Sequence, residues 1–233
     1  MIIILALLPV IVLLYYIWKK DPIPEPASQL RKAFFYGVMI SMPVSIVEMA
    51  VSSALFGPGG TYNSLFGATI EAFFVAAVPE ECAKWLVLWL IIRKNKDFDE
   101  RFDGIVYAVF VSLGFAAIEN VSYLFSNLDS WMEVGVARAL LAVPGHYAFG
   151  VLMGYYLSMY HFVNKTKYNR NLILLAPIMA HGTYDAIAMS GTTDTLVGSL
   201  STIILIFFCY QLQKHCQERV LTHARHDNDE GRA

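Results

Sequence analysis

Two adjacent glutamates and a lysine lie inside a long apolar run. The segment VPEECAKW, residues 78–85, contains Glu80, Glu81 and Lys84. Two neighbouring carboxylates in a low-dielectric environment do not both ionise easily, and a lysine one helical turn away can neutralise one of them. The other is then free to act as a general base. Adjacent positions on a helix diverge by about 100°, so we expect the two glutamates to play different parts.

Further ionisable side chains occur in later apolar runs. Glu119 lies in GFAAIEN, His146 in PGHYAFG, and His181 and Asp185 in AHGTYDA. The last two, at i and i+4, share a helix face, as do paired metal ligands or a histidine oriented by a carboxylate. A carboxylate at the centre of a membrane span costs about 2.5 to 3.5 kcal/mol, which favours a shared function for the set. These residue types suit the activation of water for hydrolysis, since no serine or cysteine stands beside a matched base.

The composition indicates a membrane environment. The chain has 233 residues, of which 57% are hydrophobic and 15% charged. Several apolar runs approach or exceed the roughly 18 to 20 residues that cross a bilayer as a helix. The three cysteines show no spacing typical of a metal site or a disulfide framework. We therefore predict an integral membrane protein with reduced cysteines and no direct nucleic-acid partner.

The apolar runs predict an all-α, polytopic fold with about seven transmembrane helices. We expect residues 1–213 to form a single transmembrane domain and residues 214–233 a cytoplasmic tail, in which His215, His223 and His226 are solvated. Gly150 and Gly154 predict a close helix approach. The seven segments are 2–18, 33–55, 64–92, 104–125, 134–160, 171–189 and 195–213.

The basic residues predict the orientation, because Lys and Arg accumulate in cytoplasmic loops. Four lie in residues 19–32, four in 93–103, three in 161–170 and four after residue 213, which is 15 of the 17 in the chain. The alternate loops contain none, and the remaining two are Lys84 and Arg138. The amino terminus is therefore expected outside, on a retained first helix, and the carboxyl terminus in the cytoplasm.

This topology brings the ionisable residues to similar depths. Helices rise about 1.5 Å per residue, which puts the set roughly 15 to 23 Å from the cytoplasmic ends of four helices. A single histidine in a membrane helix is often only an interhelical contact. Several ionisable residues at the same depth in the membrane instead predict one site. Glu48 and Glu71 remain open between a structural and a functional role. The residues at this shared depth are Glu80, Glu81, Glu119, His146, His181 and Asp185.

The motifs together resemble the PrsW family of intramembrane proteases. They are EExxK from Glu80 to Lys84, FxxxE from Phe115 to Glu119, PGHYAFG, and HxxxD from His181, and the resemblance covers most of residues 71–189. It implies a multi-pass enzyme of the bacterial cell membrane. Such an enzyme makes the first cut in a single-span anti-sigma factor, which releases sigma-W in a stress response.

The roles of the site residues are also implied by the resemblance. Glu80 would be the base for the attacking water, with Glu81 and Lys84 orienting it or holding the helix. PrsW is more distantly similar to the CAAX-processing and bacteriocin-immunity proteases. Glu119 and Asp185 differ from the residue types that this wider group has at the matching motif positions. Both a zinc-dependent and a metal-free mechanism therefore remain open. The residues that would position water, polarise the scissile carbonyl or ligate zinc are Glu119, His146, His181 and Asp185.

The expected depth of the site predicts the place of cleavage. Glu119 lies only about 9 Å below the outer end of its helix, so the cavity should open outward and the cut should fall near the extracytoplasmic boundary. Arg138 is the one basic residue in the outer half, where it would bind an acidic flank of the substrate. An ion- or proton-coupled transporter is the main alternative, although repeated halves are not seen. A membrane scaffold, with a merely structural cluster, is a third.

Overall fold

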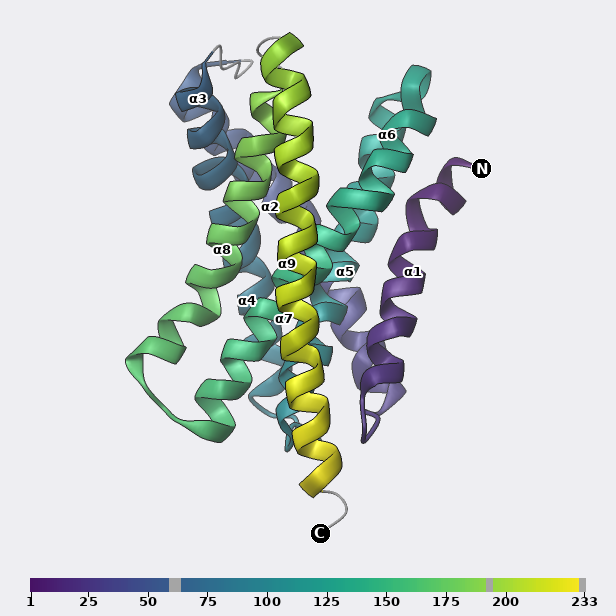
Figure 1. Ribbon diagram of the computed structural model, residues 1–233, viewed down its shortest axis with the longest axis vertical. Helices are drawn as coiled ribbons and strands as arrows, with labels where there is room; N and C mark the ends of the chain where they lie inside the picture. The colour runs from purple at the N-terminus through teal and green to yellow at the C-terminus, as the bar shows by residue number, and fades with distance from the viewer. Residues whose placement is uncertain (59–63, 192–194, 231–233) are drawn as a thin grey trace.

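The structure, a computed structural model, describes residues 1–58, 64–191 and 195–230, without the side chains of 195–197 and 230. These residues form seven helical rods and no strands, which confirms the predicted fold class (Figure 1). Single helices make five rods: α1 (Ile2–Lys20), α2 (Ala27–Phe56), α5 (Arg101–Ser126), α8 (Lys167–Ser190) and α9 (Thr195–Glu230). The other two rods are composite. One consists of α3 (Leu65–Ile70), η1 (Glu71–Ala77) and α4 (Val78–Ile92). The other consists of η2 (Leu128–Ser130), α6 (Trp131–Ala137), η3 (Arg138–Ala142), α7 (Val143–Ser158) and η4 (Met159–Val163).

Within the described ranges, five rods are long and apolar enough to cross a membrane by themselves. They are α1, α2, α5, α8 and the composite rod Leu128–Val163. The rod that ends in α4 contains several ionisable residues, and α9 continues into a polar second half. Both nevertheless run beside the other rods in Figure 1. The seven predicted segments thus each correspond to a rod.

The centre of the bundle is the pair α5 and α7. Gly154 on α7 lies directly against the backbone of Gly104 on α5, where a methyl group on Gly154 would collide with the Gly104 carbonyl. Gly150 similarly packs against Ser112 and Val109. Close approach of these two backbones confirms the expectation drawn from Gly150 and Gly154. It also places Glu119 of α5 near His146 of α7.

The first turn of α1 and the last turn of α9 lie at opposite ends of the bundle (Figure 1). The turn between α1 and α2, the segment between α4 and α5 and the segment between α7 and α8 lie at the lower end, with the last turn of α9. These are the basic segments, so the positive charges gather at one end, as the predicted topology requires. The assignment of that end to the cytoplasm stays a prediction.

The expectation that the tail after residue 213 is solvated is wrong for His223. This side chain is 1% exposed and stacks on Tyr155, with ring centroids 4.7 Å apart. Asp227 accepts a 2.7 Å hydrogen bond from the backbone N–H of Phe102. Because α9 continues without a break to Glu230, one of its faces stays against α5 and α7 beyond the apolar segment.

Candidate active site

Irregular helical turns precede two of the site residues. The π-helical segment η1 leads into α4 with Pro79 in its first turn, and η3 leads into α7 with Pro144 in the same place. Proline has no N–H to donate, and π turns widen the helix, so both features loosen the regular backbone hydrogen bonding. Glu80 and His146 each follow directly after such a turn. The same local device therefore presents both residues to the interior of the bundle.

Lys84 joins the α4 carboxylates to α7. Its ammonium nitrogen lies 2.8 Å from Glu81 Oε1, 3.0 Å from Glu80 Oε2 and 3.2 Å from His146 Nδ1. It also lies 4.4 Å from the centre of the Phe115 ring. The lysine is 1% exposed. A buried ammonium is tolerated because charged and polar partners surround it.

Glu119 connects His146 to Arg138. Its Oε2 lies 2.6 Å from His146 Nε2 and its Oε1 lies 3.1 Å from Arg138 Nη2. Arg138 Nε donates to Asn120 Oδ1 at 2.7 Å, and the guanidinium lies 3.9 Å from the centre of the Tyr123 ring. Arg138, which the sequence predicts to bind the substrate, is thus also a partner of Glu119 in the candidate site.

His181 is held between two carboxylates. Its Nδ1 lies 2.9 Å from Glu81 Oε1 and its Nε2 lies 3.2 Å from Asp185 Oδ2. The imidazole stacks on Phe149 at a centroid distance of 4.6 Å and an interplanar angle of 16°. With both nitrogens engaged and the ring face covered, His181 is fixed in orientation.

A cavity of about 870 Å³ gives access to these groups. Glu80 lies in its wall, while Glu81 is fully buried behind the wall with its carboxylate on Lys84 and His181. The two adjacent glutamates therefore do diverge as the helix geometry predicts. The cavity wall also includes Glu119, Arg138, His146, His181 and Asp185.

The structure adds α2 to the site. Glu48, left open by the sequence, lines the cavity and interacts with Glu80. Glu71 also lines it, and the Ser52 hydroxyl donates to both of its oxygens at 3.4 Å. The sequence contains a sign of this polar face of α2. At helical spacing within an apolar run it places Ser41, Ser45, Glu48 and Ser52.

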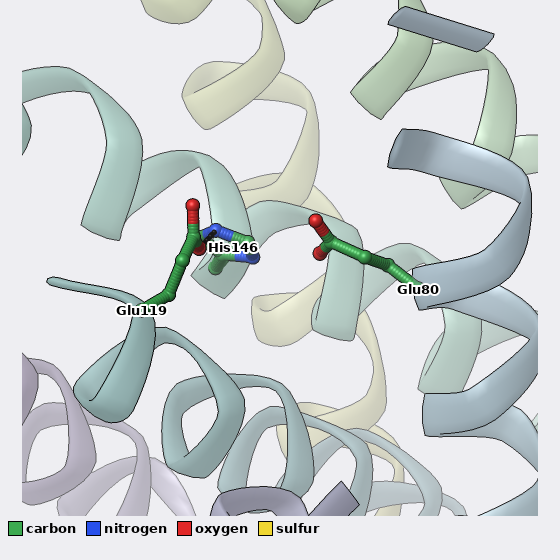
Figure 2. Close-up of side chains that lie close together, drawn as sticks. All are labelled: Glu80, Glu119 and His146. Carbon is green, nitrogen blue, oxygen red and sulfur yellow. Dashed lines mark ion pairs between the residues drawn. The ribbon is translucent and has the colours of Figure 1, made fainter. Parts of the chain in front are cut away.

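Two groups of side chains have donor types and spacing suited to zinc. The ligand atoms of Glu80, Glu119 and His146 lie within 4.8 Å of one another (Figure 2), as do those of Glu80, Glu81 and His181. Imidazole and carboxylate are common zinc ligands. The four residues expected from the sequence to be ligands are near each other but do not form such a group.

The hydrogen bonding of these groups does not fit zinc. The ammonium of Lys84 has only hydrogens to donate, so Nδ1 of His146 accepts and the ring hydrogen is on Nε2, the nitrogen that lies 2.6 Å from Glu119 Oε2. A ring nitrogen that keeps its hydrogen cannot ligate a metal. In the second group, the ammonium of Lys84 already contacts both carboxylates, at Glu80 Oε2 and Glu81 Oε1. We therefore derive no reaction step through a metal ion.

Comparisons with known proteins agree with these motifs. The sequence model of the PrsW family of intramembrane metalloproteases matches residues 25–211. Protease PrsW of Oceanobacillus iheyensis is 36% identical over 91% of this chain and 95% of its own length. Protease PrsW of Clostridioides difficile is 33% identical over 95% and 92%.

A third relative is Protease PrsW of Bacillus subtilis, which is 35% identical over 77% of this chain and 78% of its own length. No solved structure matches the chain. The matched region includes every residue of the candidate site, five of the seven helical rods in full and the first part of α9. The chain belongs to the PrsW family and is a membrane-embedded protease, a multi-pass protein of the bacterial membrane.

Proposed function

We propose that this protease hydrolyses a peptide bond near the extracytoplasmic membrane boundary of a single-span anti-sigma factor. The observation that carries the proposal is the position of the Glu80 carboxylate, which points across the cavity toward Glu119 and His146 (Figure 2). A water molecule between these groups would meet a base on one side and the contacting Glu119–His146 pair on the other. Family membership favours this over the transporter and scaffold alternatives.

Glu80 is the proposed general base. Lys84 fixes its Oε2 at 3.0 Å, which sets the direction of the carboxylate. Glu80 takes one proton from the attacking water as the oxygen bonds to the scissile carbonyl carbon. It then returns that proton to the amine nitrogen as the carbon–nitrogen bond breaks. The base is thus regenerated without a covalent intermediate.

Glu119 and His146 are the proposed positioning pair for the water. Their 2.6 Å contact, the Arg138 contact to Glu119 and the Lys84 contact to His146 fix both side chains from two directions. Fixed groups around a reacting water lower the entropic part of the barrier. His181, held by Glu81 and Asp185, has the same role on the α8 side of the cavity.

The cavity wall supports cleavage near the outer boundary. It includes Ser52, Tyr123 and Met189, which lie close to the carboxyl ends of α2, α5 and α8. In the predicted topology all three ends are extracytoplasmic. A substrate helix must unwind before attack, because its carbonyls are hydrogen-bonded, and unwinding is easiest near a helix end. The anti-sigma factor as substrate rests on the family resemblance.

The test is cleavage in liposomes that contain the purified enzyme and a membrane-anchored, single-span anti-sigma factor of the same bacterium. Mass spectrometry of the two product ends should locate the cut at or just outside the extracytoplasmic end of the substrate span. Glu133→Gln, on exposed α6, is a control that should cleave normally. A cut on the cytoplasmic side would overturn the proposed orientation, and an intact substrate with wild-type enzyme would overturn the substrate assignment.

A further inference from the structure

A second cavity, of about 460 Å³, lies at the basic end of the bundle. Its wall combines the carboxyl end of α4, the segment that follows it, η4 and the first turns of α8. In Figure 1 these parts lie at the lower end, away from α3. The cavity is therefore separate from the active-site cavity, whose wall shares none of its residues.

Two arginines in the wall have no acidic partner. Arg93 follows the last residue of α4 and Arg170 lies in the first turn of α8. Among the described residues, no Asp or Glu lies within ion-pair distance of either. The Arg93 guanidinium lies 4.6 Å from the centre of the Trp89 ring, which holds it at the cavity. Two guanidinium groups beside one hollow favour an anion, and the guanidinium fork matches the geometry of a phosphate.

The rest of the wall is apolar or amphipathic. Trp85, Trp89 and Tyr160 belong to it, and Trp and Tyr are enriched where membrane meets water. Ile92, Leu157 and Ile173 provide aliphatic surface in the same hollow. A ligand that matches this wall has an anionic head and a hydrocarbon part, which describes a phospholipid better than a free ion.

The position along the bundle also suits a lipid. This end contains the segments rich in Lys and Arg and is the predicted cytoplasmic end. The cytoplasmic leaflet contains anionic lipids, and basic pockets between transmembrane helices on that side bind their head groups. We propose that this cavity binds an anionic phospholipid of the inner leaflet, with Arg93 and Arg170 on the phosphate and the acyl chain along the aliphatic wall.

The bound lipid would join two helices of the active site. Trp85 and Trp89 lie on α4, one to three turns after Glu80 and Glu81, and Arg170 lies on α8, which contains His181 and Asp185. A phosphate held by both arginines links the basic ends of α4 and α8. The lipid therefore stabilises the relative placement of the helices that contribute the carboxylates and His181.

The experiment measures lipid binding by the full-length protein in mild detergent. Wild-type protein, delipidated and then titrated with phosphatidylglycerol, should retain it in native mass spectrometry and unfold at a higher temperature. Phosphatidylcholine should give neither effect. The Arg93→Gln/Arg170→Gln double variant should bind phosphatidylglycerol roughly tenfold or more weakly, since two charge-assisted contacts are lost.

A matched control separates this site from the general basic surface. Lys94→Gln/Lys167→Gln removes two neighbouring exposed charges that do not line the cavity, and it should bind as the wild type does. Equal binding by the wild type and the arginine double variant would overturn the proposal. A thermal shift reproduced by inorganic phosphate alone would identify a free-phosphate site instead. A shift reproduced by phosphatidylcholine would show that the negative charge of the head group is not recognised.

Discussion

The ammonium nitrogen of Lys84 lies 3.2 Å from Nδ1 of His146, although 62 residues separate them in the chain. This contact determines which ring nitrogen carries the hydrogen, because an ammonium has only donors and Nδ1 must accept. The hydrogen is then on Nε2, the nitrogen that lies 2.6 Å from Glu119 Oε2. One lysine thus orders the α4 carboxylates and, through His146, the carboxylate of α5.

The two adjacent glutamates should respond differently to the same substitution. Glu80→Gln removes the proposed base from the cavity wall, and we expect cleavage to fall by about 10² to 10⁴ with the protein still folded. Glu81→Gln weakens the buried contacts to Lys84 and His181. That should destabilise the protein by about 3 to 5 kcal/mol.

Cleavage rates in liposomes and thermal unfolding in detergent separate these two effects. Near-normal turnover of Glu80→Gln would exclude it as the base. Equal loss of folded protein in both variants would instead support a structural role for the pair.

The topology has a direct test with reporter fusions. A reporter after residue 58 or 128 should be extracytoplasmic, and one after residue 97 or 166 should be cytoplasmic. The reason is the distribution of the basic residues, of which 15 lie in segments expected on one side. An alkaline phosphatase fusion is active outside and a green fluorescent protein fusion is fluorescent inside. A single inverted loop among the four would refute the orientation.

Zinc dependence follows from the same contact between Lys84 and His146. Because His146 keeps its Nε2 hydrogen in this arrangement, we expect full cleavage after extensive chelation and no stoichiometric zinc in elemental analysis of active enzyme. Lys84→Met would free Nδ1 to carry the hydrogen and Nε2 to bind a metal, so zinc affinity should rise in that variant. Activity that disappears with the chelator and returns with zinc would refute the metal-free mechanism.

Much of the site was predictable because ionisable residues are rare in membrane spans. Glu80, Glu81, Glu119, His146, His181 and Asp185 were placed at one depth by counting residues, and the structure brings them together. The contribution of Glu48 was not predictable in this way, since its partner Glu80 lies on another helix. Depth along a helix does not specify which face meets which neighbour.

The tail illustrates a second limit of the sequence. Residues after 213 are polar enough to suggest solvent, yet Cys216, Val220 and His223 are buried. Their burial follows from helix continuity, because a helix already packed through Cys209 presents the same face for several further turns. Average polarity gives no information about such a narrow buried stripe.

The basic end of the bundle also contains a cluster of carboxylates whose protonation should affect stability. Burial raises the pKa of Asp21 to about 7, although the backbone N–H groups of Glu25 and Ile23 oppose the shift. Burial likewise raises the pKa of Glu100 to about 7, with further contributions from neighbouring acids. The negative charges of Glu25 and Asp227 raise both pKa values, and those of Asp99 and Asp21 raise the pKa of Glu100 further.

A folded-state pKa above the unfolded value means that the folded protein binds the proton more tightly. The stabilisation is complete below about pH 4 and is lost as the pH rises through about 7. Thermal unfolding in detergent should therefore shift to lower temperature across this range. Asp21→Asn should flatten the dependence, whereas Asp129→Asn, on exposed η2, should not. An unchanged slope in Asp21→Asn would remove Asp21 from the explanation.

Arg138 offers the last prediction, because the sequence and the structure suggest different roles for it. The sequence places it at an acidic flank of the substrate, while in the structure its Nη2 and Nε groups contact Glu119 and Asn120. Asn120 in turn donates to the carbonyl of Ala6 at 2.7 Å, so the contact extends from η3 through α5 to α1. We expect Arg138→Ala to lower kcat because Glu119 loses its fixed position.

The substrate distinguishes the two roles. If Arg138 acts through Glu119, neutralising the acidic residues beside the cleavage site should leave wild-type cleavage unchanged, and Arg138→Lys should recover part of the rate. If it binds the acidic flank, the neutralised substrate should show a raised KM with the wild type and no further loss with Arg138→Ala. Steady-state kinetics on the four combinations of enzyme and substrate form a double-mutant cycle, in which coupling between Arg138 and the flank appears only in the second case.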